Sequence, residues 1–164
     1  MLYITMNKIF KIYTIFTFSL IISFVSANTI KEAKNLYNLK RYDEAYVILN
    51  GLEKNAETKY YLALLYGKGK GVKHNVAKAV KLFKEAANDN FAPAQFFLGI
   101  AYLNGYVVKE SKSIGLYYLL LSEKNNYIEA KSAINNVKKI LTETELKDAF
   151  KLFKNCPRNF TECF

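Results

Sequence analysis

The chain has 164 residues, with 24 lysines and arginines against 14 aspartates and glutamates, which gives a formal net charge of +10. That length favours a single domain with a real hydrophobic core. Two cysteines and one histidine exclude a zinc site built from cysteine and histidine pairs. This excess of positive charge is consistent with binding to nucleic acid, to an anionic membrane or to an acidic partner. A lysine-rich composition without a functional meaning gives the same excess.

Residues 1–27 have the pattern of a secretory signal peptide. Lys8 and Lys11 precede an uncharged, largely apolar run at Ile12–Phe24, and Val25–Ala27 supplies small residues after it. The run is short for a membrane span, which needs about 20 apolar residues. We therefore predict cleavage after Ala27 and export to the bacterial periplasm or secretion. An uncleaved membrane anchor is the alternative.

The remaining chain predicts eight helices in four pairs. The expected helices are Ile30–Leu39 with Asp43–Glu53, Glu57–Tyr66 with Val76–Asn88, Ala94–Leu103 with Lys112–Lys124, and Ile128–Ile140 with Thr142–Lys154. The first pair should bury Ala33, Leu36, Tyr42, Ala45 and Leu49, and Val76–Asn88 should bury a stripe at Ala79, Leu82, Phe83, Ala86 and Ala87. Thr142 and Glu145 have the spacing of a capping box.

The middle of the chain repeats itself with a fixed offset. Tyr66 aligns with Tyr102 and Gly69 with Gly105, and similar residues fill many of the positions between them. A fixed period in the range of about 20–50 residues is the mark of a repeat array. We therefore predict an all-α fold, an α-α superhelix (solenoid) of about four helix hairpins.

Two segments carry a family resemblance. AETKYYLALLYGKGKGVKHNVAKAVKLFKEAANDN and AQFFLGIAYLNGYVVKES resemble the Sel1-like repeat, with its Ala-x3-Leu-Gly-x2-Tyr-x2-Gly-x-Gly-Val pattern, and the first helix pair is closer to a tetratricopeptide repeat. The second repeat departs from the first, since Val107 stands in place of Gly71 and Gly115 in place of Ala79. The resemblance implies a repeat domain at 28–155, made of a tetratricopeptide-like pair at 28–54, repeats at 56–91 and 92–127, and a capping pair at 128–155.

The glycine-rich stretch YGKGKGVKHN, Tyr66–Asn75, raises a choice between a phosphate-binding loop and a turn. A Walker-type loop needs a preceding strand and a Ser or Thr after Gly-Lys, and neither is present in this sequence. The aligned second copy also lacks two of the three glycines. We therefore predict a turn between two helices. His74 has no carboxylate close to it in sequence, so we predict no catalytic residue, no metal site and no cofactor.

The resemblance to tetratricopeptide repeats implies a partner-binding groove lined by the first helix of each pair. Its expected residues are Lys34, Tyr37, Asn38, Glu57, Tyr60, Leu64, Lys68, Phe96, Ile100, Asn104, Ser132, Asn136 and Lys139. The first helices are apolar nearly all the way round, so this surface is either a docking face or is covered by neighbouring helices. Between Glu57 and Glu85 the sequence has several lysines and no acidic residue. This run of positive charge fits a partner of acidic character or a solvated face.

These features predict a non-enzymatic protein–protein interaction module, an adaptor or scaffold with a role in envelope regulation or host interaction. An exported hydrolase of cell-envelope material, acting on peptidoglycan or a β-lactam, is the alternative. The expected partner is another protein or peptide, not nucleic acid, and a membrane is contacted only through an uncleaved anchor or weak electrostatic attraction. Cys156 and Cys163 in the tail at 156–164 are predicted to form a disulfide, because the compartment is oxidising.

Overall fold

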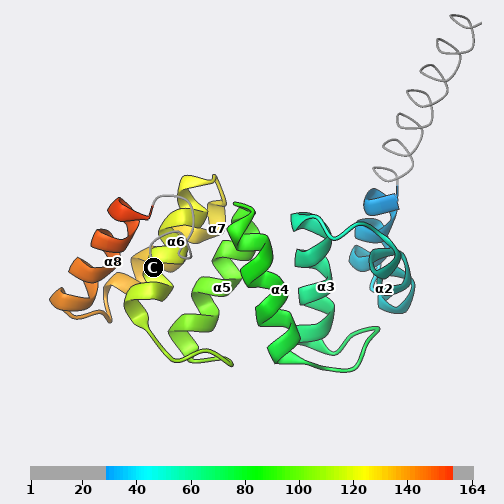
Figure 1. The fold of residues 1–164 in the computed structure, drawn as a ribbon, viewed down its shortest axis with the longest axis horizontal. Helices are drawn as coiled ribbons and strands as arrows, with labels where there is room; N and C mark the ends of the chain where they lie inside the picture. Colours follow the sequence, from blue (N-terminus) through cyan, green and yellow to red (C-terminus); the bar gives the residue numbers. More distant parts are fainter. Residues whose placement is uncertain (1–28, 157–164) are drawn as a thin grey trace, which may run out of the picture. The chain divides into compact units, whose positions relative to one another are not determined.

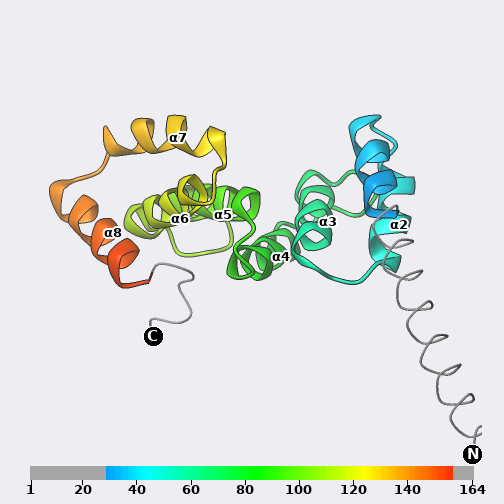
Figure 2. The same ribbon diagram turned by 90° about the horizontal axis from the view of Figure 1, so that it is seen from above.

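The computed structural model describes residues 29–156, which divide into two compact units (Figures 1 and 2). The N-terminal unit is Met1–Leu52 and the C-terminal unit is Glu53–Phe164. Every regular element in residues 29–156 is a helix, and none of these helices is long and apolar enough to cross a membrane. The predicted signal peptide at 1–27 lies outside the described residues, as does Cys163.

The described part of the N-terminal unit is one helix pair. Residues 29–38 are helical, and α2 follows at Tyr42–Gly51. Four small or aliphatic side chains predicted to face inward are buried, namely Ala33, Leu36, Ala45 and Leu49. Tyr42, which was also predicted to face inward, is only half-buried, and its ring packs edge-on against the Tyr37 ring at a centroid distance of 5.3 Å.

The C-terminal unit contains three further hairpins. They are α3 (Ala56–Lys68) with α4 (Val76–Asn88), α5 (Ala92–Asn104) with α6 (Lys112–Lys124), and α7 (Ile128–Lys138) with α8 (Glu143–Asn155). Each hairpin packs on the next, since α4 contacts α5, and α6 contacts both α7 and α8 (Figure 2). This stacking is the predicted all-α solenoid arrangement, and α4 and α6 have the bounds expected from the sequence.

The turn between α3 and α4 and the turn between α5 and α6 have the same geometry. Gly69 and Gly105 end α3 and α5 with φ of 61° and 66°, a left-handed conformation that glycine adopts without a steric penalty. Asn75 and Ser111 then cap the next helices with their side chains. The backbone N–H of Asn75 donates to the Tyr66 carbonyl at 2.9 Å, and the backbone N–H of Ser111 donates to the Tyr102 carbonyl at 3.0 Å. YGKGKGVKHN is therefore a structural turn, as predicted.

The connections between hairpins also repeat. Asn90 and Asn126 follow α4 and α6 with φ of 60° and 66°. The backbone N–H of the residue after each asparagine donates to the carbonyl five residues earlier. Phe91 bonds to Ala86 at 3.1 Å, and Tyr127 bonds to Ser122 at 3.0 Å. Asparagine tolerates the left-handed conformation better than most residues, so the same helix ending is encoded twice.

The two hairpins differ in how their helices fit together. Gly67 and Ala79 face each other in the first, and a Cβ added to Gly67 would lie an ordinary 3.4 Å from the Ala79 Cβ. Leu103 and Gly115 occupy the corresponding positions in the second, and a Cβ added to Gly115 would lie only 2.6 Å from the Leu103 Cγ. The glycine is thus required by the leucine opposite, so the second hairpin accommodates a larger side chain at this crossing only because residue 115 has none.

The core of the C-terminal unit centres on α6. Its residues Gly115–Ser122 are all buried, so α6 is covered on every side by α5, α7 and α8. The predicted capping box at the start of α8 is present, since Thr142 and Glu145 bond to each other's backbone amides. In α4, the sequence pattern predicted a buried Leu82, but Leu82 is half-buried and Val80 is buried instead.

Candidate functional site

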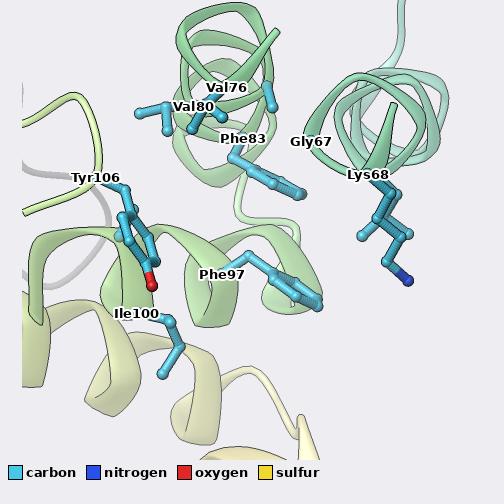
Figure 3. A pocket seen from close by; sticks show the side chains of 11 residues that line it. Gly67, Lys68, Val76, Val80, Phe83, Phe97, Ile100 and Tyr106 are labelled. Atoms are coloured by element: carbon cyan, nitrogen blue, oxygen red, sulfur yellow. The ribbon is translucent and has the colours of Figure 1, made fainter. Parts of the chain in front are cut away.

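A pocket of about 400 Å³ opens in the C-terminal unit between α3, α4, α5 and the loop after α5 (Figure 3). Its volume lies within the range of about 300–1,000 Å³ that is typical of ligand sites. Aliphatic and aromatic side chains dominate its lining. The lining residues are Leu64, Gly67, Lys68, Val76, Ala79, Val80, Phe83, Phe97, Ile100, Ala101 and Tyr106.

The α4 helix supplies one wall of the pocket through a single stripe. Val76, Ala79, Val80 and Phe83 follow one another at the three- and four-residue spacing that places side chains on one helix face. The absence of a side chain at Gly67 keeps this wall close to the C-terminal end of α3. The pocket therefore comes from the same small-residue packing that joins the two helices of the first repeat.

Stacked aromatic rings form the middle of the site. The Phe83 and Phe97 rings are nearly parallel, at a centroid distance of 5.2 Å and an interplanar angle of 8°. The Tyr60 ring packs beside both, at 5.9 Å from Phe83 and 6.0 Å from Phe97, and also contacts Phe91 at 5.3 Å. Because each ring is held by others, this part of the pocket is pre-formed.

Two residues of different character mark the two sides of the pocket. Figure 3 shows Lys68 of α3 on one side and Tyr106 on the other, with Phe83 and Phe97 between them. Tyr106 is 55% exposed and its neighbour Val107 is 60% exposed. Val107 has a φ of 60°, which is strained for a β-branched residue and which Gly71 adopts at the matching position of the first repeat. The loop thus displays two large, mainly apolar side chains to solvent.

The charge around the pocket is positive. The nearest acidic residues on α4 and after it share one lysine, since Lys59 Nζ lies 3.1 Å from Asp89 Oδ2 and 3.9 Å from Glu85 Oε2, and the lysines around the pocket outnumber the one negative charge that remains. On the opposite side of α4, Lys78 Nζ donates to the Tyr66 hydroxyl at 2.7 Å. Lys84 is exposed and follows Val80 by one helical turn, so it extends the row of α4 residues that starts at the pocket wall.

Some of the residues predicted for a groove line this pocket, and others lie elsewhere in the C-terminal unit. Three of them line the pocket, namely Leu64, Lys68 and Ile100. Tyr60 belongs to the neighbouring aromatic cluster. Phe96 packs against the buried cluster of α6, α7 and α8 and lies 5.3 Å from the Tyr127 ring, centroid to centroid.

The other predicted groove residues are spread over both units. In the C-terminal unit, Glu57 is half-buried in the first turn of α3, the Asn104 side chain donates to the Ile100 carbonyl at 2.8 Å, and Ser132, Asn136 and Lys139 are exposed. In the N-terminal unit, Lys34 and Tyr37 are half-buried and Asn38 is exposed. The prediction that these residues form one groove with the others stays a prediction.

Sequence reasoning missed the α4 wall and the loop. Phe83 belongs to the stripe predicted for Val76–Asn88, which we interpreted as core, whereas Val76 and Val80 lie outside that stripe although they share the three- and four-residue spacing with Ala79 and Phe83. Tyr106 and Val107 stand where the first repeat has Lys70 and Gly71, so an apolar pair replacing a polar turn was the available signal. His74 is exposed in its turn, and residues 29–156 contain no group of three or more side chains able to hold a metal ion.

Comparison with known proteins agrees with this architecture. A family model described as Sel1 repeat matches residues 56–91 and 92–127. The chain is similar to the structure of a protective antigen of uropathogenic Escherichia coli strains that displays an SLR fold, with 19% identity and a TM-score of 0.71, covering 84% of this chain and 31% of that chain.

A Sel1 repeat protein from Oxalobacter formigenes is similar as well, with 26% identity and a TM-score of 0.64, covering 77% of this chain and 52% of that chain. The chain thus spans about a third and about half of the lengths of these two relatives. A search of curated proteins found no match.

Proposed function

Because the chain contains two Sel1 repeats, at residues 56–91 and 92–127, we propose that it is a non-enzymatic adaptor that binds a segment of another protein. Sel1 repeats are a type of protein-interaction module. The observation that carries the proposal is the pre-formed apolar pocket between α3, α4 and α5. An open apolar surface of this kind on a folded protein marks an interaction site.

The physical reason is the free energy of covering this surface. Apolar area removed from water contributes roughly 25 cal/mol per Å². The aromatic rings at the centre are already ordered by their neighbours, so a partner gains this contribution without first having to immobilise them. Aromatic residues, tyrosine and phenylalanine among them, are enriched in the cores of protein interfaces.

The compartment we propose is the bacterial periplasm or the exterior of the cell, with work in envelope regulation or in contact with a host. The pattern of residues 1–27 supports export. Cell fractionation and an intact mass test this part of the proposal. We expect the protein outside the cytoplasm, with residues 1–27 removed. A full-length protein in the cytoplasm would contradict export.

Selection from a random peptide library on the purified, immobilised protein tests the adaptor function. We expect a small set of related peptides to be enriched and to bind with dissociation constants in the micromolar range, about −8 kcal/mol. An unrelated helical protein of similar charge serves as the control surface. The adaptor function is wrong if no peptide is enriched over that control.

A further inference from the structure

We propose that the pocket between α3, α4 and α5 binds an amphipathic helix of acidic character, through two bulky apolar side chains one helical turn apart. This inference rests on the proposed adaptor function and specifies its ligand. It uses three properties of the site: the volume of the pocket, the scarcity of polar groups in its lining and the charge beside it.

The volume of the pocket calls for more than one side chain. An apolar cavity of about 150 Å³ holds one benzene ring. The present pocket, at about 400 Å³, holds two groups of that size. Its lining is continuous from Lys68 to Tyr106, with the stacked Phe83 and Phe97 between them, so the two groups would lie side by side over the aromatic rings.

The chemistry of the lining favours a helix over an extended peptide. Of the 11 residues that line the pocket, only Lys68 and Tyr106 have polar atoms in their side chains. An extended segment pressed against this surface would leave its amides and carbonyls without hydrogen-bond partners, which costs free energy. A helix bonds its own backbone, so it can present two apolar side chains, spaced three or four residues apart, without that cost.

The charge beside the pocket favours acidic residues on that helix. Lys68 is part of the lining, and Lys84 is exposed on the row of α4 that includes Val76 and Val80. Glu85 and Asp89 share Lys59, so this group keeps one net negative charge, which the two positive charges of Lys68 and Lys84 exceed. Carboxylates that flank the apolar pair of the ligand would lie near these ammonium groups, which raises the rate of association and orients the helix.

The experiment is a selection of 16-residue peptides displayed on phage, followed by measurement of the enriched peptides by fluorescence polarisation. We expect enriched sequences with an excess of Asp and Glu and with large apolar residues three or four positions apart. Binding should weaken at high salt, because the lysines contribute through charge. Enrichment of Pro-rich, basic or strictly alternating sequences would overturn the inference while leaving the adaptor function intact.

Three variants locate the binding on the protein. Lys68→Glu with Lys84→Glu should weaken binding about tenfold or more, or about 1.4 kcal/mol for each factor of ten. Lys147→Glu with Lys151→Glu on α8 makes the same change in net charge at exposed positions outside the pocket and should leave binding within about twofold. Tyr106→Ser, an exposed position, should also weaken binding about tenfold without affecting the fold.

The outcomes separate the two proposals. Equal binding by the pocket variants and the α8 variant would place the peptide elsewhere and refute the pocket as its site. No enriched peptide at all would refute the adaptor function and this inference together. Co-sedimentation with phosphatidylglycerol vesicles that is lost only in the Lys68→Glu, Lys84→Glu variant, without peptide binding, would assign the lysines to a membrane surface and would also overturn the inference.

Discussion

The exchange of Gly67 and Ala79 for Leu103 and Gly115 makes a quantitative prediction about the second hairpin. In the Gly115→Ala variant, the new methyl group would lie 2.6 Å from the Leu103 Cγ and 3.1 Å from the Gly99 carbonyl oxygen. The Cγ is the branch point of the leucine, not its tip, and the carbonyl belongs to the α5 backbone. The carbonyl can move only with the α5 backbone, and the Cγ can move only if the partly buried leucine leaves its rotamer.

Two opposing effects set the magnitude. Alanine stabilises a helix interior by about 0.5–1 kcal/mol relative to glycine. Overpacking of a close contact costs about 1–3 kcal/mol. Because backbone limits the relaxation on one side, we expect the steric cost to prevail, with a net loss of about 1–2 kcal/mol in the free energy of unfolding. Gly67→Ala, where the added Cβ meets only ordinary contact, is the matched control and should be neutral or slightly stabilising.

Urea unfolding followed by circular dichroism measures these differences, and a double-mutant cycle isolates the clash. Leu103→Ala alone should destabilise the protein because it removes partly buried apolar surface. Combined with Gly115→Ala, it should be less harmful than the sum of the two single changes, by about 1–2 kcal/mol. A Gly115→Ala variant as stable as the Gly67→Ala control, or strict additivity with Leu103→Ala, would refute the reasoning.

Three further predictions concern the loop, the core and the tail. Val107→Gly should raise the free energy of unfolding by about 1 kcal/mol, because relief of left-handed strain exceeds the backbone entropy cost of glycine. Val108→Gly is the control. Equal changes in the free energy of unfolding of the two variants, measured in urea, would show that Val107 is not strained. Burial raises the pKa of the Tyr118 phenol well above its ordinary value. The neutral phenol therefore stabilises the fold fully below about pH 10 and less as the pH rises above it, so Tyr118→Phe should lose less stability than the wild type between about pH 10 and 11; parallel losses in urea midpoints would contradict this. Cys156 and Cys163 are predicted to form a disulfide, so thiol titration of the unreduced protein should find no free thiol. Two titratable thiols would refute the predicted disulfide.

Much of the fold could be predicted because its signals are local. Gly69 and Gly105 end helices, Asn75 and Ser111 begin them, and these residues recur at the same offset. Each acts on the backbone within a few residues of itself, so its effect does not depend on what packs nearby. The starts of α4 and α6 follow directly from Asn75 and Ser111.

The candidate site was harder to predict, because its walls come from three helices. Phe83 belongs to an apolar stripe that has the same pattern whether a neighbour covers it or leaves it open. Phe96 and Phe97 are adjacent and chemically alike, yet one packs against the α6–α8 cluster and the other lines the pocket. Only the placement of α5 against α4 and α6 distinguishes them.

The sequence by itself determined that the chain makes helical hairpins with a fixed period, the bounds of α4 and α6, and that lysines outnumber acids along the first repeat. The tertiary structure alone decided which apolar side chains are covered and which line an open pocket, and why Gly115 must be a glycine. The physical reason is range: hydrogen-bonded caps and helical periodicity act between residues a few positions apart, whereas packing volume depends on side chains that meet only after the helices are stacked.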